Sequence, residues 1–167
     1  PLWLVLSPET VKEVVAVSGP ELSDLMSGIT TTDADFVVKV IDVFPDDFVY
    51  DASMKGDGKN YPMGGYQMLV RAEIMRGKFR NSYETPEPFV PNKITEVKYV
   101  LPDVAHTFKK GHRLMIQVQS TWFPLADRNP QKFINIYTAS DSDFQKADIK
   151  IYHDGVNASS VILPVLK

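Results

Sequence analysis

The chain has 167 residues, a length that suits one domain with a sizeable hydrophobic core, and its composition (44% hydrophobic, 23% charged) excludes whole-chain disorder. A formal net charge of −3, spread along the chain, argues against nucleic-acid binding, and no apolar run is long enough to span a membrane. The absence of cysteine excludes disulfides, thiolate metal sites and a cysteine nucleophile.

Alternation of apolar and polar residues dominates the chain, and no long stretch has helical periodicity. In chain order, strands are predicted at Leu2–Leu6, Val11–Val17, Leu22–Thr30, Asp35–Val43, Tyr66–Glu73, Lys78–Asn81, Ile94–Leu101, Arg113–Ser120, Ala147–His153 and Ser159–Val165. One short helical turn is expected at "SDSDFQKA", with Ser140 as its cap and Asp143 as an acid in its first turn. About eight to ten short strands favour a single all-β domain, an antiparallel sandwich or barrel.

The sequence contains no nucleophile elbow of an α/β-hydrolase. No serine has a glycine two residues before it and another two residues after it, and the βαβ alternation that holds such an elbow is missing. We therefore exclude a serine hydrolase active site of the α/β type in this chain.

The residues that bind metals elsewhere are sparse here. His106 and His112 flank the turn "TFKKG", with Asp103 as the one obvious acidic neighbour, whereas zinc needs three or four ligands. Asp51 and Asp57, around "KGDGKN", lack the spacing and closing glutamate of a calcium loop. Ordinary strand-edge histidines and a hairpin tip are the favoured interpretations, and we predict no metal and no cofactor.

Aromatic side chains leave a sugar-binding platform open as an alternative. The candidates are Trp122, Phe123, Tyr61, Tyr66, Phe79 and Tyr83. The favoured interpretation is that aromatic residues at alternate strand positions fill the core of the sandwich.

The stretch "GHRLMIQVQSTWFPLADRNPQ" begins as a strand and ends as a loop rich in charged and aromatic residues. Pro124 ends the strand pairing, because it has no N–H to donate. Asp127 and Asn129 can bond nearby backbone N–H groups, and the Arg128 guanidinium suits a carboxylate or carbonyl partner. A self-contained turn and a docking role are equally open at this point.

Four stretches together resemble a known family: "TTDADFVVKVIDVFPDD", "GGYQMLVRAEIMRGKFRNSYETPEPFVPNK", "LPDVAHTFKKGHRLMIQVQSTWFPLADRNPQ" and "DFQKADIKIYH". The chain resembles the C-terminal jelly-roll domain of the cocaine-esterase-like acyl hydrolases. That group includes α-amino-acid ester hydrolases, glutaryl-cephalosporin acylases and X-Pro dipeptidyl-peptidases. The resemblance extends from about Leu2 to Val165.

The resemblance implies a jelly-roll β-sandwich of the galactose-binding-domain-like type, forming one domain over residues 1–167 that is excised from a larger hydrolase. In that family the catalytic Ser-Asp-His triad lies in an upstream α/β-hydrolase domain that carries a helical cap. The chain alone is therefore expected to be inactive, and its partners are expected to be those two domains. We expect the contact with them to involve Tyr66, Met68, Trp122, Phe123, Asp127, Arg128 and Asn129.

Two further hypotheses stay open, because such sandwiches host many functions. The chain is alternatively an independent carbohydrate- or ligand-binding module, or a structural module for oligomer contacts. We expect no nucleic-acid or membrane partner. The resemblance favours a periplasmic or secreted location over a cytoplasmic one, because many members of the family are exported. The sequence indicates neither the substrate nor the oligomeric state.

Overall fold

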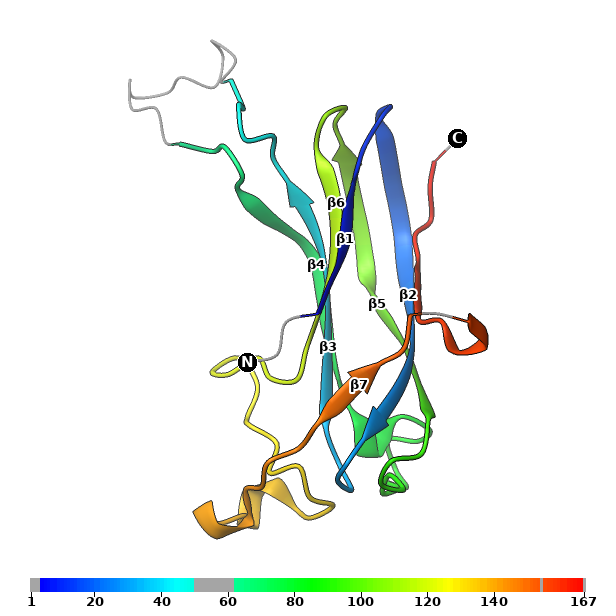
Figure 1. Ribbon diagram of the computed structural model, residues 1–167, viewed down its shortest axis with the longest axis vertical. Helices are drawn as coiled ribbons and strands as arrows, with labels where there is room; N and C mark the ends of the chain where they lie inside the picture. The colour runs from blue at the N-terminus through cyan, green and yellow to red at the C-terminus, as the bar shows by residue number, and fades with distance from the viewer. Residues whose placement is uncertain (1–3, 50–61, 154, 167) are drawn as a thin grey trace.

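The computed structural model describes residues 4–49, 62–153 and 155–166, and strands form its framework (Figure 1). The strands are β1 Leu4–Thr10, β2 Val15–Ile29, β3 Asp35–Val43, β4 Gln67–Arg76, β5 Thr95–Phe108, β6 Arg113–Gln119, β7 Ile149–Ile151 and β8 Ser160–Ile162. Short 3₁₀ helices lie in the connections: η2 Gly77–Phe79, η3 Ile136–Thr138, η4 Asp141–Asp143 and η5 Gly155–Asn157. Within the described ranges, no helix has the length and apolar character that crossing a bilayer requires.

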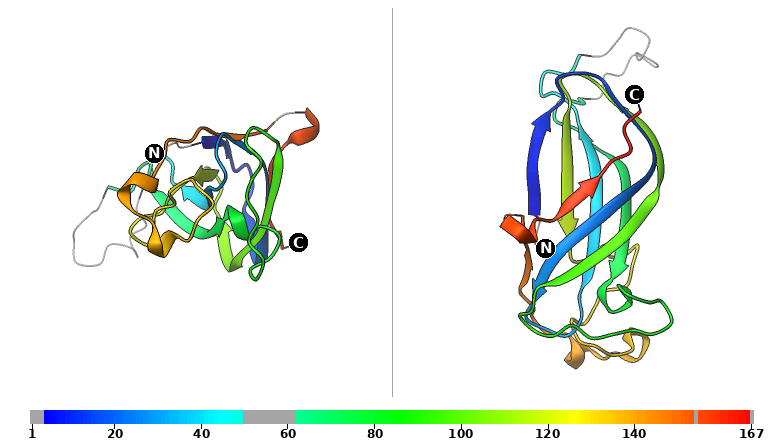
Figure 2. Two further views of the ribbon diagram at one scale, coloured as in Figure 1. Left: turned by 90° about the horizontal axis from the view of Figure 1, so that it is seen from below. Right: turned by 90° about the vertical axis from the view of Figure 1, so that its right-hand side faces the viewer.

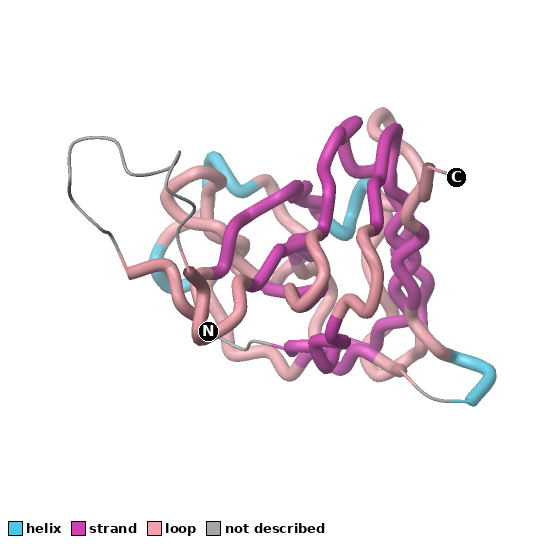
Figure 3. The backbone as a smooth tube through the Cα atoms, turned by 90° about the horizontal axis from the view of Figure 1, so that it is seen from above, coloured by secondary structure: helices cyan, strands magenta, loops and turns pink. Residues whose placement is uncertain are grey.

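The strands pair antiparallel in two sheets. The first sheet has the order β1-β6-β3-β4. In the second sheet β5 follows one edge of β2, while β7 and β8 pair with β2 at residues 27–29 and 22–24. Figure 2 shows β2 and β5 as long curved strands lying over the first sheet, and Figure 3 shows the strands surrounding one interior. The predicted antiparallel β-sandwich is confirmed, and the likeness to galactose-binding domains stays a prediction.

β3 lies between β4 and β6 and is buried along almost its whole length. Its residues Phe36, Val38 and Val40 point into the sandwich, because alternate side chains of a strand share a face. The buried side chains of the second sheet in the same core include Leu25, Val97, Leu101 and Phe108. The apolar, β-branched run "DFVVKVIDV" thus forms a buried strand with the predicted bounds.

Two of the predicted gaps between strands, at residues 7–10 and 18–21, lie within strands in the structure, so these gaps are wrong. The chain passes through "SPET" within β1 and through Gly19–Pro20 within β2, so β2 is one strand of 15 residues. Each passage coincides with a shift in strand register, between Leu6 and Glu9 and between Gly19 and Glu21. A bulge lets a proline, which has no N–H, leave the hydrogen-bond ladder without ending the strand.

The predicted strand at Lys78–Asn81 is also wrong, because the chain turns there as η2. A Cβ on Gly77 would lie 2.5 Å from the Phe89 ring and 2.6 Å from the Ala34 carbonyl oxygen. The Gly77 N–H donates to that same carbonyl at 2.8 Å. The turn therefore depends on the close approach of the Gly77 backbone to the Ala34 backbone. The hydrophobic periodicity of the sequence contains no signal of this contact.

The remaining elements follow the predictions with changed lengths. β5 continues through Pro102 to Phe108, whereas β7 and β8 are shorter than predicted. The helical turn at "SDSDFQKA" is confirmed as η4, where the Asp143 carboxylate accepts from the Ser140 N–H at 3.0 Å. This bond, with Lys132 nearby, lowers the pKa of Asp143 to about 2. Three residues of the predictions lie outside the described ranges: Asp51, Asp57 and Tyr61.

Candidate functional site

The loop that follows β6, named here the signature loop (residues 121–135), carries most of the predicted contact residues. Figure 1 shows it in yellow, running from the end of β6 to the lower end of the sandwich. The loop contains no strand or helix. Its conformation therefore depends on bonds between its polar groups and the neighbouring elements.

Asp35, at the start of β3, is the main anchor of the signature loop. Its carboxylate is 1% exposed, accepts from Asn129 Nδ2 at 2.7 Å and lies 3.3 Å from Arg76 Nε. Arg76 Nη2 donates to the Asp127 carbonyl at 3.1 Å, and Asn129 Oδ1 accepts from the Gln131 N–H at 2.8 Å. Burial raises the pKa of Asp35 to about 6, and the contacts with Asn129 and Arg76 oppose this rise only in part. Asn129 is thus a buried support of the loop.

A second buried carboxylate, that of Asp33, fixes the other side of the loop. Asp33 Oδ1 accepts from the Lys78 N–H at 3.1 Å, and burial raises the pKa of Asp33. Lys78 Nζ in turn donates to the Ile134 carbonyl at 2.8 Å. The Phe133 N–H donates to Thr32 Oγ1 at 2.9 Å. Bonds on both sides therefore hold the signature loop against β3 and η2.

Large apolar side chains of the signature loop and the following turn face solvent. Phe123 is 63% exposed, Leu125 71% and Tyr137 85%. Leu125 and Tyr137 line a groove of about 750 Å³ between the loop and η2. The Arg128 guanidinium lies 5.9 Å from the Phe123 ring centroid and 5.2 Å from that of Phe144. Exposed apolar groups gathered in this way are typical of a surface that another protein covers.

Trp122 extends this surface onto the outer face of the first sheet. Its ring lies 4.7 Å from the Lys39 ammonium, and burial lowers the pKa of that ammonium. Ile41 and Val43 share the face of Lys39 by alternation and form a second apolar cluster with Met115. The outer face of the first sheet therefore carries a small apolar cluster on the same face as Lys39 and Trp122.

The structure does not bring Tyr66 and Met68 to the signature loop. Tyr66, 49% exposed, precedes β4 and packs against Phe44 at the end of β3 distant from Asp35. The nine residues of β3 span about 27 Å at the usual strand rise. Met68 pairs with Asp42, whose carboxylate points inward, so the Met68 side chain is on the inner face of the sheet.

The two predicted strand-edge histidines meet at one buried carboxylate. His106 Nε2 lies 2.9 Å from Asp42 Oδ2, and His112 Nδ1 lies 2.8 Å from Asp42 Oδ1. Asp42 belongs to the first sheet and His106 to the second, so the three side chains join the sheets. Within the described ranges, no three His, Cys, Asp or Glu side chains are grouped to hold a metal ion.

The prediction that the candidate aromatic residues fill the core is wrong for three of them. Tyr66, Tyr83 and Phe123 are exposed. Phe79 and Tyr83 stack with ring centroids 6.4 Å apart, whereas Tyr66 packs against Phe44 at the end of β3 distant from Asp35. The core aromatic residues are Phe36, Phe89, Tyr99 and Phe108.

A protein family matches the chain over nearly its whole length. The family described as "X-Pro dipeptidyl-peptidase C-terminal non-catalytic domain" matches residues 4–162. The chain belongs to this family. The cocaine esterase of Rhodococcus sp. (strain MB1 Bresler) is 27% identical over 164 residues, which are 98% of this chain and 25% of that protein.

Solved structures of larger enzymes contain the same domain. An aminopeptidase from a marine sediment Thaumarchaeota archaeon matches with a TM-score of 0.88 and 37% identity, over 99% of this chain and 26% of that one. An α-amino acid ester hydrolase matches with a TM-score of 0.86 and 39% identity, over 99% and 25%. A CocE/NonD family hydrolase from Staphylococcus aureus, at 15% identity and a TM-score of 0.66, shares the fold. The chain spans about a quarter of the length of its first relatives, so this non-catalytic family matches one part of larger proteins.

Sequence reasoning missed the three carboxylates that hold the site, those of Asp33, Asp35 and Asp42. Each is no more than 1% exposed and bonded to a group distant in sequence. The available signal was an aspartate within or next to an apolar, β-branched strand. Such a carboxylate is buried only when partners satisfy it.

Proposed function

We propose that the chain packs on an α/β-hydrolase domain of a larger polypeptide and helps to wall the substrate cleft of that domain. The catalytic triad belongs to the hydrolase domain in this proposal, and the reaction is acyl transfer from an ester or amide to water. The contact is formed by Trp122, Phe123, Asp127 and Arg128, with Tyr66 as an outlying contact. Asn129 supports that surface from inside, whereas Met68 lies on the inner face of the first sheet and has no part in the proposed contact.

The observation that carries the proposal is the contrast between the two sides of the signature loop. Its inner side is fixed by buried bonds to Asp35, whereas its outer side presents Phe123 and Leu125 to solvent. An anchored loop with exposed apolar side chains suits a preformed contact surface, because little conformational entropy is lost on docking. The match to a family of C-terminal domains and the greater length of the relatives support the presence of such a partner in a larger polypeptide.

The test compares exposed apolar positions inside and outside the proposed surface. Phe123→Glu and Leu125→Glu are expected to lower the melting temperature and the ester turnover of the parent polypeptide, because the first places a carboxylate in the contact and the second places one directly beside it. Val156→Glu is the matched control, since Val156 is 99% exposed on η5. Equal, unchanged behaviour of all three variants would contradict the proposal.

A second measurement tests the proposal that the chain has no catalytic activity of its own. The chain by itself is expected to give no turnover of an activated ester above the buffer rate, and a fluorophosphonate probe is expected to label none of its serines. Labelling of a serine would overturn this part of the proposal.

A further inference from the structure

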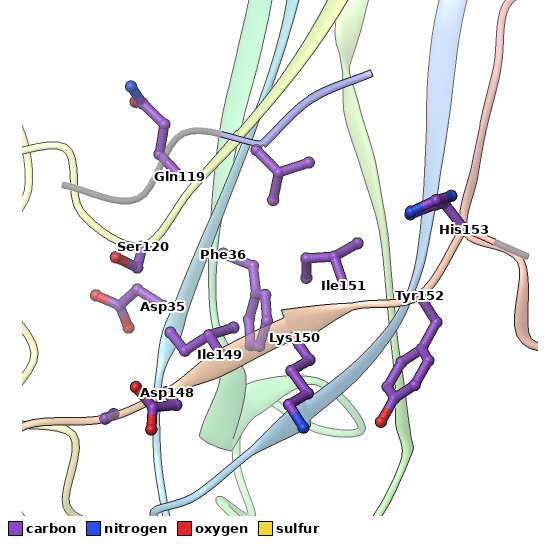
Figure 4. Close-up of a pocket in the computed structure, with 12 residues that line it drawn as sticks. Asp35, Phe36, Gln119, Ser120, Asp148, Ile149, Lys150, Ile151, Tyr152 and His153 are labelled. Carbon is purple, nitrogen blue, oxygen red and sulfur yellow. The ribbon is translucent and has the colours of Figure 1, made fainter. Parts of the chain in front are cut away.

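A groove of about 470 Å³ lies between the two sheets beside β7 (Figure 4). Ile149 and Ile151 project into it from β7, toward Phe36 of the first sheet. Polar groups are at its ends, with Asp35 at one and His153 at the other. The middle of the groove is therefore apolar, and it continues the core of the sandwich.

The backbone of β7 has an unpaired edge beside this groove. The Asp148 carbonyl accepts from the Thr30 N–H at 3.1 Å, and the Tyr152 N–H donates to the Met26 carbonyl at 2.9 Å. In an antiparallel pair, residues directed at the partner strand alternate with residues directed away from it. The N–H and C=O groups of Ile149 and Ile151 thus point away from β2, where no strand of the described ranges pairs with them.

Beside β7, the second sheet is one strand narrower than the first sheet. The first sheet is four strands wide, whereas at β7 the second sheet consists of β5, β2 and β7. A strand added next to β7 would bond its unpaired backbone groups and cover the groove at the same time. Addition of an extended segment to an exposed sheet edge is a recurrent mode of protein recognition.

The path of the chain indicates where such a segment comes from. β1 enters the first sheet at Leu4, which pairs with Val118, a residue that lines the groove. The family is a C-terminal domain, and the relatives are about four times as long as this chain. The polypeptide that precedes the domain in such a protein therefore arrives beside the groove.

We infer that an extended segment of the parent polypeptide, from the part that precedes this domain, pairs with the free edge of β7 and fills the groove. Its alternate side chains are apolar and contact Phe36, Ile149 and Ile151, because those residues form the groove floor. This inference rests on the proposed function in one respect, the existence of a larger parent polypeptide.

Residue-resolved amide hydrogen exchange tests the pairing. In the parent polypeptide the Ile149 and Ile151 amides are expected to exchange at least about 100-fold more slowly than in the chain by itself. The Tyr152 amide, already bonded to β2, is the internal control and is expected to be protected in both. Equal exchange of Ile149 and Ile151 in the two proteins would overturn the inference.

Two further outcomes separate this inference from the proposed docking. Lower solvent accessibility at Phe123 in the parent, without protection of Ile149 and Ile151, would leave docking intact and overturn the added strand. In the chain by itself, the Ile149 amide could become more protected from exchange as the protein concentration rises. This result would show that a second copy of the chain pairs with the edge of β7, and it would also overturn the inference. Ile149→Asp is the complementary variant, expected to lower the melting temperature of the parent more than that of the chain.

Discussion

Because the carboxyl of Asp35 is buried, we predict that this domain becomes less stable as the pH rises from 4 to 6. Burial raises the pKa of Asp35 from 3.8 to about 6 in the folded chain. The folded state therefore binds a proton that the unfolded state has already released in this range, so the free energy of unfolding falls with rising pH. At about 1.4 kcal/mol for each tenfold change in proton affinity, the loss is about 3 kcal/mol.

Urea unfolding followed by tryptophan fluorescence, at half-unit steps from pH 4 to pH 7.5, measures this loss. Asp35→Asn removes the titrating group and is expected to flatten the pH dependence by about 3 kcal/mol. A smaller slope of the same sign should remain, because burial also raises the pKa of Asp33 and of Glu21.

Asp143→Asn is the matched control for Asp35→Asn. The pKa of Asp143 is lowered to about 2, so its stabilising effect is present above the unfolded-state pKa and is lost only as the pH falls toward 2. Its replacement should leave the slope between pH 4 and pH 6 unchanged. A wild-type domain that is more stable at pH 6.5 than at pH 4.5, or an Asp35→Asn variant with the wild-type slope, would refute the reasoning.

Three further predictions concern single contacts and are read from the free energy of unfolding in urea. Asn129→Ala should cost about 1–3 kcal/mol, because Asp35 loses its 2.7 Å partner inside the protein; an unchanged value would contradict the anchor. Asp42→Ala should cost about 2–5 kcal/mol, because the bonds to both His106 and His112 are lost together. A cost below about 1 kcal/mol would argue against the cross-sheet link. Gly77→Ala should cost about 1–3 kcal/mol, because the new Cβ would clash with the Ala34 carbonyl. Gly28→Ala is the control and should cost less, because its Cβ would lie 3.4 Å from the Tyr152 ring.

Local sequence patterns predicted those parts of the fold that depend on neighbouring residues. β3 follows from one continuous apolar run, and the η4 cap follows from Ser140 and Asp143 at the required spacing. The same patterns predict two strands in place of β2, because Gly19–Pro20 has the local composition of a turn as well as that of a bulge.

The candidate site could not be predicted from local sequence patterns, because it depends on contacts between residues that are far apart in the sequence. Asp42 is 64 residues from His106 and 70 from His112, and Asp35 is 94 residues from Asn129. Only the packing of strands brings these groups together. The residue types of the signature loop indicate a turn. They do not indicate that Asn129 is buried, because its burial depends on the position of β3.

Asp35 links the two surfaces that we propose to contact the rest of a larger polypeptide. Its carboxylate holds the signature loop through Asn129, and the same residue lines one end of the groove beside β7. A strand added over the groove would displace the solvent nearest to Asp35, and desolvation by burial is the first cause of its raised pKa. In the parent polypeptide the decline of stability should therefore extend to a higher pH than in the chain by itself. If docking involved the signature loop alone, the pH range of the decline would be the same in both, so titration of this one carboxyl distinguishes the two contacts.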